Sequence, residues 1–585
     1  MTEKEAINGA LPTSGHLPMY VMHKFFARKQ EDVIREYIQA FSKKEEIVCD
    51  PFCGSGVMIG EAIRLGRKAV GIDINPVSIF ITKNTLKHIS DLNRIIEEFH
   101  RIKAEVKTDI TRLYQTTCRN CGKNIAAICF TWKDKDPIDV RYECPEHGRN
   151  ISPVNELDLK LLNKIEDGEI IEFFDDDGDC RYWYPVNKFY YNDKTPFLKK
   201  ERFNSVDEIF SKRNLISLAK LYDQIKKIDD LELQEVFKFA FSSMTHLASK
   251  MTPVRPSRPY SSAWVQQSYW YCPNNMESNV WNLFERAVIG RQGLVKAKEN
   301  LSESFKKKTQ ASSFKELIKG QNNDYLLIES SINNVEEIKE DSVDLVITDP
   351  PYGYSIQYGE LLYMWGCWLQ LMDNFDDIAR GEIITNPRQK KSDVEYERML
   401  KIAFKKIFQW LKPESYCIVT FHNPNLKYRN ILFRSVLLNG FEFEKIVYQP
   451  PPRASAKSFL QPFGSQRGDY FFRFRKPRWR NDTISYKSID ANQVEELIVD
   501  ITKRILVERG EPTCYTDIQN MLDPILYEKL KKSQLLMDFN PENIEKILKR
   551  HVGDIFEVVD VDIEGIGNQK LQGKGWWLIN SKKNG

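Results

Sequence analysis

Short apolar runs alternate with amphipathic segments over the first part of the chain, and this alternation predicts an α/β unit. Residues 31–41 (EDVIREYIQAF) place apolar side chains at helical spacing. Residues 45–50 (EEIVCD) form a short apolar strand that ends in an acid, and a glycine-containing turn leads into a helix over 57–66. A second strand over 68–73 and a second helix over 75–89 follow. Strand, tight turn, helix and strand in this order form half of a doubly wound sheet.

The strand pattern stops after the second helix and resumes far downstream. Strands are predicted in DYLLIES, VDLVITD and SYCIVTFHN, a helix over 394–410, and a closing hairpin in FEFEKIVYQ and DYFFRFRK. The sheet that begins in residues 17–90 is therefore completed in residues 323–478. Residues 91–322 are predicted to form a large, mainly helical domain inserted between the two halves of this sheet.

The pattern changes again near the C-terminal end. Helices are predicted in VEELIVDITKRILVERG, EPTCYTDIQNML and PENIEKILKRH, and strands in IFEVVDVD and GKGWWLIN. Helices followed by a two-stranded wing are typical of a winged-helix domain, here over residues 485–582. Winged helices bind either DNA or a protein partner, and the fold alone leaves both open.

Composition agrees with several globular domains. The chain has 585 residues, which is more than a single hydrophobic core usually contains. Its 85 Lys and Arg against 82 Asp and Glu give a net charge of +3. A nucleic-acid surface must therefore come from local clusters of cations. No apolar stretch approaches the roughly 18 residues of a membrane helix, and the N-terminal residues do not resemble a signal peptide. With an odd count of 11 cysteines, these features predict a cytoplasmic protein without a disulfide framework.

The segment DPFCGSG, residues 50–56, joins the first strand to its helix. Gly54 and Gly56 permit a sharp turn and the close approach of a ligand to the end of the strand. Asp73 ends the next strand, where a carboxylate can accept both ribose hydroxyls of a nucleoside. An ordinary glycine turn is the alternative when the glycine-containing turn is taken alone. The flanking strand with Asp50 and Asp73 favours cofactor binding. The turn has neither a GxGxxG nor a P-loop pattern, so a dinucleotide is less expected.

A second motif, DPPY, follows the apolar strand VDLVIT. Asp349 is expected at the carboxyl edge of the sheet, where open α/β sheets bind ligands. Pro350 and Pro351 fix the backbone and leave carbonyl oxygens free to accept hydrogen bonds, and Tyr352 offers a ring for stacking. Acceptors beside a stacking ring suit the exocyclic amino group of a base. The alternative is a proline-rich turn at the end of a strand.

DPFCGSG, GIDINP and DPPY together resemble the motifs of the N6-adenine and N4-cytosine DNA methyltransferases, which methylate amino groups with S-adenosylmethionine. MHKFFARK and TDPPYGYSIQYGELLYMW resemble segments of one bacterial and archaeal subgroup of that family, so the resemblance covers about residues 17–475. It implies a Rossmann-like methyltransferase sheet, S-adenosylmethionine as cofactor and double-stranded DNA as partner. It also implies a place in restriction–modification, with a cognate restriction or defence nuclease as a further candidate partner.

The resemblance implies roles for individual residues. The cofactor-binding residues that it implies are Lys24, Arg28, Asp50, Phe52, Gly54, Gly56 and Asp73. Lys24 or Arg28 would meet the methionine carboxylate, and Asp73 the ribose. The catalytic residues that it implies are Asp349, Pro350, Pro351 and Tyr352. The Asp349 carboxylate and the Pro350 carbonyl would accept hydrogen bonds from the target amino group, which prepares its lone pair for in-line attack on the sulfonium methyl. Tyr352 would stack on the flipped base.

Two features bear on the substrate and the cofactor. Asp before PPY favours adenine N6, because serine is commoner there in the cytosine N4 enzymes, so cytosine N4 is the alternative. Many relatives also carry an acid at the end of the strand before DPPY, but DYLLIESSINN offers only Glu329 followed by serines. The residue that would meet the adenine of the cofactor is therefore not assigned.

Two other functions remain open. DPFCGSG with DPPYG also resembles tRNA guanine-N2 methyltransferases, which usually carry an RNA-binding domain before the first motif. Only 49 residues precede that motif here, and the large domain is inserted instead. The other alternative is a non-enzymatic DNA-binding regulator on a degenerate methylase scaffold. Intact Asp50 and Asp349 argue against it.

Two short knuckles lie in the inserted domain, between residues 118 and 147. Each is followed by a glycine, and they supply Cys118, Cys121, Cys144 and His147. Thiolate and imidazole ligands at this spacing suit tetrahedral zinc, and a site with four protein ligands would be structural. Buried free cysteines are the alternative.

The segment MTPVRPSRPYSSAWVQQSYWYC, residues 251–272, interleaves cations with aromatic rings. This pattern suits phosphate contacts and base stacking, and an aromatic core packed on the catalytic domain is an equal alternative. The candidate nucleic-acid-binding residues are Arg255, Arg258, Tyr260, Trp264 and Trp270, together with Lys457 in a later loop.

Overall fold

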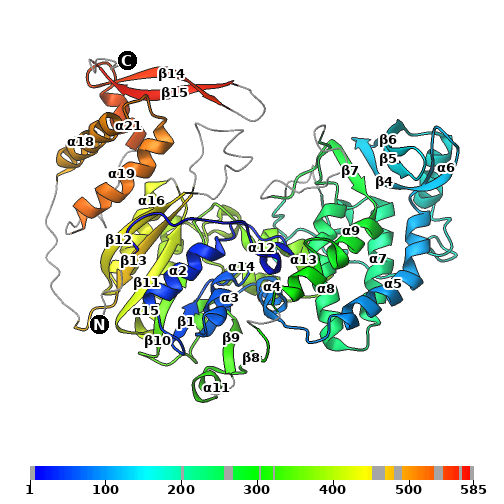
Figure 1. Ribbon diagram of the computed structural model, residues 1–585, viewed down its shortest axis with the longest axis horizontal. Coiled ribbons are helices and arrows are strands. Elements are labelled where there is room, and N and C mark those ends of the chain that lie inside the picture. Colours follow the sequence, from blue (N-terminus) through cyan, green and yellow to red (C-terminus); the bar gives the residue numbers. More distant parts are fainter. Residues whose placement is uncertain are drawn as a thin grey trace.

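The computed structural model describes residues 7–198, 203–255, 268–301, 305–320, 323–423, 425–450, 468–479, 490–531, 544–564 and 570–579. Figure 1 shows a sheet domain with the inserted domain on one side of it and the C-terminal domain on another. The sheet has eight strands in the order β12-β13-β11-β10-β1-β2-β9-β8. Their bounds are Ile47–Asp50 (β1), Lys68–Asp73 (β2), Thr309–Gln310 (β8), Asn323–Glu329 (β9), Val343–Thr348 (β10), Leu411–Phe421 (β11), Glu442–Gln449 (β12) and Asp469–Arg475 (β13).

The sheet is mixed, and its parallel part is formed by both halves of the chain. Strands β8, β9, β2, β1, β10 and β11 run parallel, and β13 and β12 run antiparallel as the closing hairpin. β1 pairs with β2 on one side and with β10 on the other, so the carboxyl ends of the DPFCGSG and DPPY strands lie side by side. The predicted α/β sheet split by an insertion is therefore confirmed, and β8 is the one strand of it that was not predicted.

Helices cover both faces of this sheet. Val48 and Leu345 belong to the core beneath α2 and α3, whereas Cys49 and Val346 belong to the core beneath α15 and α16. Both faces of β1 and β10 are buried, and strands buried on both faces are continuous apolar runs, which is why the sequence reveals them. The covering helices are α2 (Glu31–Phe41), α3 (Val57–Arg64), α15 (Asp393–Trp410) and α16 (Leu426–Leu437).

The inserted domain contains a sheet as well as the expected helices. Its helices include α5 (Asn93–Arg112), α6 (Glu156–Glu166), α7 (Lys212–Lys226), α8 (Leu231–Thr245), α9 (Val280–Ile289) and α10 (Leu294–Glu299). Its five strands are β3 (Gln115–Thr117), β4 (Asn124–Lys133), β5 (Asp136–Cys144), β6 (Gly148–Pro153) and β7 (Asn274–Ser278). They form an antiparallel sheet in the order β3-β4-β5-β6, with β7 paired to β4. The mainly helical prediction therefore missed this sheet, whose strands are partly exposed.

The sequence also placed one boundary too late. β8 and the short helix α11 (Phe314–Lys319) lie within the residues assigned to the inserted domain, which was expected to end at 322. In the structure β8 pairs in parallel with β9, and Phe314 and Leu317 of α11 belong to the core of the main sheet. This part of the chain therefore belongs to the sheet domain.

The C-terminal domain packs on the closing hairpin of the sheet. It consists of α18 (Ala491–Arg509), α19 (Tyr515–Leu530), α21 (Ile544–Arg550) and the antiparallel pair β14 (Phe556–Glu564) and β15 (Lys570–Leu578), drawn in orange and red in Figure 1. The ring of Tyr527 in α19 stacks on Phe433 of α16 at a centroid distance of 4.9 Å. The predicted helices and hairpin are present, and the winged-helix class itself stays a prediction.

Within the described ranges, every helix is too short or too polar to cross a bilayer.

Candidate active site

A cavity lies at the carboxyl ends of β1, β2 and β10. Asp50, Gly54 and Asp73 line it from the DPFCGSG half of the sheet, and Asp349 and Pro351 line it from the DPPY half. Residues that are almost 300 positions apart in the sequence therefore share one cavity, because their strands are neighbours in the sheet. This is the edge at which open α/β sheets bind ligands.

The glycine turn forms the floor of the cavity in a conformation that glycine alone adopts readily. Gly54 and Gly56 have φ angles of +51° and +76°. A Cβ atom at Gly54 would lie 2.9 Å from the ring of Phe25, and one at Gly56 would lie 2.5 Å from Thr82. The Gly54 N–H donates to Asp73 at 3.0 Å, which ties the turn to the end of β2. The close approach of Phe25 and Thr82 thus requires glycine at both positions, and the turn has a fixed backbone conformation at the edge of the cavity.

Two buried carboxylates flank this turn. Asp50 accepts hydrogen bonds from the Thr348 hydroxyl at 2.7 Å and from the Phe52 N–H at 3.1 Å, and burial raises its pKa to about 7. Asp73 accepts from the backbone N–H groups of Gly54 and Asn75, and burial raises its pKa to about 6. A cation or a hydrogen-bond donor entering the cavity would stabilise the ionised form of both.

Asp349 is held by three groups. Its carboxylate accepts from the Thr420 hydroxyl at 2.5 Å and from the Tyr352 hydroxyl, and the ammonium of Lys29 lies 3.2 Å away. Burial raises the pKa of Asp349, and the positive charge of Lys29 opposes that rise. An ionised carboxylate at this position can accept hydrogen bonds from an amino group.

Lys29 is a site residue that the sequence analysis missed. Its side chain is 6% exposed, lines the cavity, and donates to the Tyr352 hydroxyl at 2.7 Å and to Asp469 at 3.0 Å. Burial opposes its charge, but Asp349 and Asp469 raise its pKa above the usual value. Only its position in MHKFFARK, beside Arg28, could have suggested this role.

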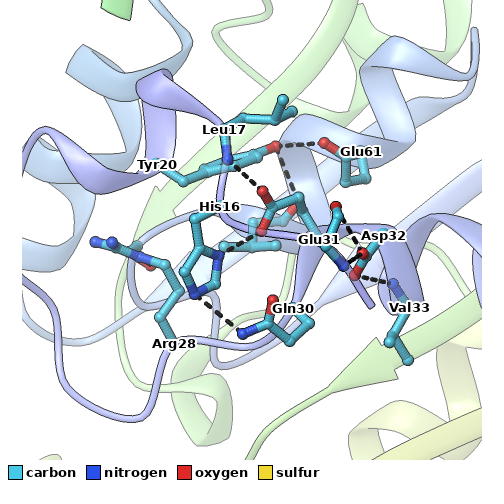
Figure 2. Close-up of polar contacts among 12 residues, drawn as sticks. His16, Leu17, Tyr20, Arg28, Gln30, Glu31, Asp32, Val33 and Glu61 are labelled. Atoms are coloured by element: carbon cyan, nitrogen blue, oxygen red, sulfur yellow. Dashed lines mark hydrogen bonds and ion pairs between the residues drawn. The ribbon is translucent and has the colours of Figure 1, made fainter. Parts of the chain in front are cut away.

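Figure 2 shows how the N-terminal segment is anchored beside the cavity. Glu31 at the start of α2 accepts from the Leu17 N–H at 2.5 Å, and His16 Nδ1 lies 2.5 Å from its other oxygen. The Tyr20 hydroxyl donates to Glu61 of α3 at 2.9 Å. These contacts join residues on both sides of Arg28 to the helices that cover the sheet, and so they fix the loop that carries it.

The other predicted cofactor residues divide into two groups. Arg28 and Phe52 line the cavity, and Arg28 donates to the His23 carbonyl at 2.5 Å. Lys24 does not line it, and its ammonium lies 5.0 Å from the ring centroid of Phe26. Of the two cations proposed for the methionine carboxylate, the geometry therefore supports Arg28.

The predicted stacking ring does not line the cavity. Tyr352 is 7% exposed, packs edge-on against Phe421 at 4.9 Å, and its hydroxyl is bonded to Asp349 and Lys29. Neither Tyr352 nor Pro350 lines the cavity. The stacking of Tyr352 on a base therefore stays a prediction.

The predicted zinc ligands converge at the edge of the inserted sheet. The ligand atoms of Cys118, Cys121, Cys144 and His147 all lie within 4.8 Å of one another. Cys121 and Cys144 are 3.8 Å apart between sulfur atoms, and His147 Nδ1 lies 3.7 Å from the Cys118 sulfur and 3.5 Å from that of Cys144. Four sulfur ligands at about 2.3 Å from a tetrahedral zinc would be about 3.8 Å apart, so the spacing fits that ion.

The structure describes only some of the predicted nucleic-acid-binding residues. Arg258, Tyr260, Trp264 and Lys457 lie outside the described residues. Arg255 and Trp270 are half-buried, and Trp270 packs against the core of the inserted domain. The adjacent Tyr269 is buried, and its hydroxyl donates to the Leu361 carbonyl at 3.1 Å in the segment after DPPY. At Tyr269 the structure therefore favours the aromatic-core alternative.

The chain is similar to known DNA methylases over part of its length. Residues 3–84 match the family model described as DNA methylase. The chain is 28% identical over 145 residues to the Type II methyltransferase M.HinfI of Haemophilus influenzae, a match that covers 23% of this chain and 37% of the relative. The chain thus spans little more than a third of that relative's length.

A solved structure also overlaps in part. A crystal structure from Listeria monocytogenes, assigned to the S-adenosylmethionine-dependent methyltransferases, is 11% identical, with 29% of this chain and 81% of that chain covered at a TM-score of 0.16. This overlap is too slight to bear on fold or function. The family model and the M.HinfI match instead agree with the motifs that meet in the cavity, and over part of its length the chain is similar to the N6-adenine and N4-cytosine DNA methylases.

Proposed function

We propose that this chain transfers a methyl group from S-adenosylmethionine to the exocyclic amino group of a base flipped out of double-stranded DNA. One observation carries the proposal: Asp349 of DPPY lines the same cavity as Asp50, Gly54 and Asp73. An acceptor for an amino group therefore lies beside a turn that suits a nucleoside cofactor. The partial match to M.HinfI supports the same chemistry.

The residues of the cavity would have different roles in this transfer. Asp73 would hold the ribose, and Asp50, Gly54 and Arg28 would face the methionine part. When bound, the cofactor would supply an electrophilic methyl group on sulfur. The carboxylate of Asp349 would accept a hydrogen bond from the target amino group, which draws the nitrogen lone pair out of conjugation with the ring. Positioning and electrostatics of this kind supply most of the acceleration in such a transfer.

Adenine N6 is the favoured target, because Asp349 stands where serine is commoner in cytosine N4 enzymes of the family. Cytosine N4 and tRNA guanine N2 remain the alternatives, and a non-enzymatic regulator is the least supported. A cognate nuclease, a restriction–modification role and DNA contacts by the inserted domain are proposals that rest on the family.

We also propose that Cys118, Cys121, Cys144 and His147 hold a structural zinc ion. The fit of their spacing to a tetrahedron supports this, and so does the position of His147 at the turn between β5 and β6. With all four ligands from the protein, no position would be open for chemistry.

Transfer of a labelled methyl group to DNA and to tRNA would test the main proposal. We expect labelling of DNA, its loss in Asp349→Ala, and unchanged binding of S-adenosylhomocysteine by that variant. Glu340→Ala is the matched control, since this exposed acid precedes the same strand outside the cavity. Long-read modification sequencing would then identify the base and its sequence context. Labelling of tRNA alone, or methylation that survives in Asp349→Ala, would overturn the assignment.

A further inference from the structure

Glu382 is a buried carboxylate in the cavity that the motifs do not account for. Its side chain is 4% exposed, and one oxygen, Oε1, accepts from the Gly359 N–H at 3.1 Å. The other oxygen, Oε2, is buried and has no hydrogen-bond partner among the described residues. Buried polar atoms in folded proteins almost always have a partner, so this one indicates a group that enters the cavity.

The neighbouring cation does not satisfy that oxygen. Lys391 donates to the backbone carbonyls of Ala379 at 2.5 Å and of Glu382 at 2.6 Å. Its positive charge opposes the rise in the pKa of Glu382, but it donates no hydrogen bond to Oε2. Gly359 also leaves room in front of Oε2, because a Cβ atom there would lie only 2.9 Å from it. The free oxygen therefore faces space that a side chain at residue 359 would fill.

Glu382 lies beside the ends of the strands that would hold a nucleoside. It directly follows α14 (Phe375–Gly381), and the Ser331 hydroxyl donates to the Gly381 carbonyl at 3.2 Å, which docks this segment on the end of β9. Ser330 and Ser331 line the same cavity. The negative charge of Asp73 adds to the burial that raises the pKa of Glu382, so the two carboxylates share one environment.

The acid that the sequence offered for this position points elsewhere. Glu329 ends β9 and is exposed, and it lines a separate polar hollow rather than the cavity. The serines that follow Glu329 reach the cavity, but they cannot replace a carboxylate as a strong acceptor. The adenine-side acceptor left unassigned by the sequence must therefore come from another element.

We propose that Glu382 accepts a hydrogen bond from the nucleoside part of the cofactor, either from a ribose hydroxyl or from the adenine amino group. This inference rests on the proposed function, because it names a binding residue of the same site. Glu382 would then supply, from the segment after α14, the carboxylate that many relatives carry after the strand before DPPY.

Binding of S-adenosylhomocysteine to the full chain by calorimetry tests this inference. We expect Glu382→Ala to weaken binding about tenfold or more, since a hydrogen bond to a charged group is lost. Glu382→Gln keeps one acceptor oxygen, and we expect an intermediate loss from it. Glu329→Gln is the matched control and should change the affinity by less than about twofold, because this acid lies outside the cavity. Thermal unfolding without ligand would show whether each variant is folded.

Analogues of the same ligand distinguish the two donors. A 2′- or 3′-deoxyribose analogue lacks one hydroxyl, and a purine analogue lacks the amino group. The analogue that lacks the true donor should bind the wild type more weakly, and that penalty should disappear in Glu382→Ala.

Three outcomes separate the inference from the function on which it rests. Wild-type binding and methyl transfer with unchanged affinity in both Glu382 variants would overturn the inference alone. Equal penalties for every analogue in wild type and Glu382→Ala would do the same. No binding of S-adenosylhomocysteine by the wild type would overturn the proposed function together with the inference.

Discussion

The ammonium of Lys29 lies 3.2 Å from the carboxylate of Asp349, and it also donates to the Tyr352 hydroxyl at 2.7 Å. Tyr352 in turn donates to the same carboxylate. Both contacts, and that of the Thr420 hydroxyl, are made to the Oδ1 atom of Asp349, so a base can still reach the carboxylate through Oδ2. Lys29 is the cation beside this carboxylate that favours its ionised form.

Replacing Lys29 should slow methyl transfer and shift its dependence on pH. Without that charge, burial and the nearby Asp469 would raise the pKa of Asp349 further, and a smaller fraction would be ionised at neutral pH. We expect Lys29→Met to lower the single-turnover rate about tenfold or more near pH 7, with partial recovery as the pH rises. Rates measured at several pH values would show the shift.

Lys24→Met is the control for this change, because Lys24 belongs to the same segment but does not line the cavity. Its rate should stay within about twofold of the wild type. A wild-type rate and pH profile in Lys29→Met would show that Lys29 has no part in setting the charge of Asp349.

The raised pKa values of Asp50, about 7, and Asp73, about 6, predict a pH-dependent affinity for the cofactor. S-adenosylmethionine carries a sulfonium charge that S-adenosylhomocysteine lacks, and a cation favours ionised carboxylates. We therefore expect affinity for S-adenosylmethionine to rise between about pH 6 and pH 8, with release of protons. The rise for S-adenosylhomocysteine should be smaller. Calorimetry in two buffers of different ionisation enthalpy would measure both the affinity and the protons released.

The same raised pKa values make the protein without cofactor less stable as the pH rises. Both folded-state pKa values exceed the unfolded value near about 3.9, so the protonated forms favour folding. This contribution is complete below about pH 4 and is lost as the pH rises through about 6 to 7. Asp50→Asn should reduce both this loss and the proton release. Equal affinity for S-adenosylmethionine at both ends of the pH range would contradict the prediction.

The sequence revealed the sheet better than it revealed the site. β1, β2 and β10 were predicted because strands buried on both faces are short continuous apolar runs. β6 was missed because no residue of GRNISP is fully buried, so the segment has no apolar periodicity that would reveal a strand. Asp50, Gly54, Asp73 and Asp349 could be proposed because each lies at the end of a predictable strand or shortly after it.

Lys29 and Glu382 could not be found in that way. Both lie in segments outside the strands, and each reaches the cavity only through tertiary packing, Lys29 through the anchored N-terminal loop and Glu382 through the docking of α14 on β9. Their chemical role depends on neighbours distant in the sequence. A local pattern does not carry that information.

A fully buried ion pair joins the C-terminal domain to the sheet domain. Arg429 of α16 pairs with Asp523 of α19, and both side chains are 0% exposed. Arg429 also donates to the Asn423 carbonyl at 3.0 Å, and Asn423 donates to the Tyr352 carbonyl of DPPY at 3.0 Å. We expect Asp523→Ala to destabilise the chain by about 3–5 kcal/mol, since it leaves a buried charge without its partner. Chemical denaturation followed by tryptophan fluorescence would measure this loss.

Because of the link to Tyr352, the same change should lower the rate of methyl transfer more than the affinity for S-adenosylhomocysteine. Glu414→Ala is the control: it breaks the exposed pair with Arg475 and should cost less than about 1 kcal/mol. If Asp523→Ala unfolds at the same denaturant concentration as the wild type, the buried pair does not hold the two domains together.

Removal of zinc should destabilise the inserted domain. The four ligand atoms lie close enough for one tetrahedral ion, and they come from the turn between β3 and β4, the end of β5 and the turn between β5 and β6. A structural zinc site contributes directly to folding, so a chelator should lower the unfolding temperature of the full chain. We expect one zinc ion per chain in protein purified without chelators, measured by plasma mass spectrometry.

Cys118→Ser should lower both the zinc content and the unfolding temperature. Cys180→Ser is the matched control, because this half-buried free cysteine belongs to the same domain but lies outside the cluster. It should keep a full zinc equivalent and change the unfolding temperature little, since substitutions away from cores and metal sites usually cost less than about 0.5 kcal/mol. Clearly less than one zinc per chain in the wild type, or equal zinc content in the two variants, would show that the four residues do not hold a structural zinc ion.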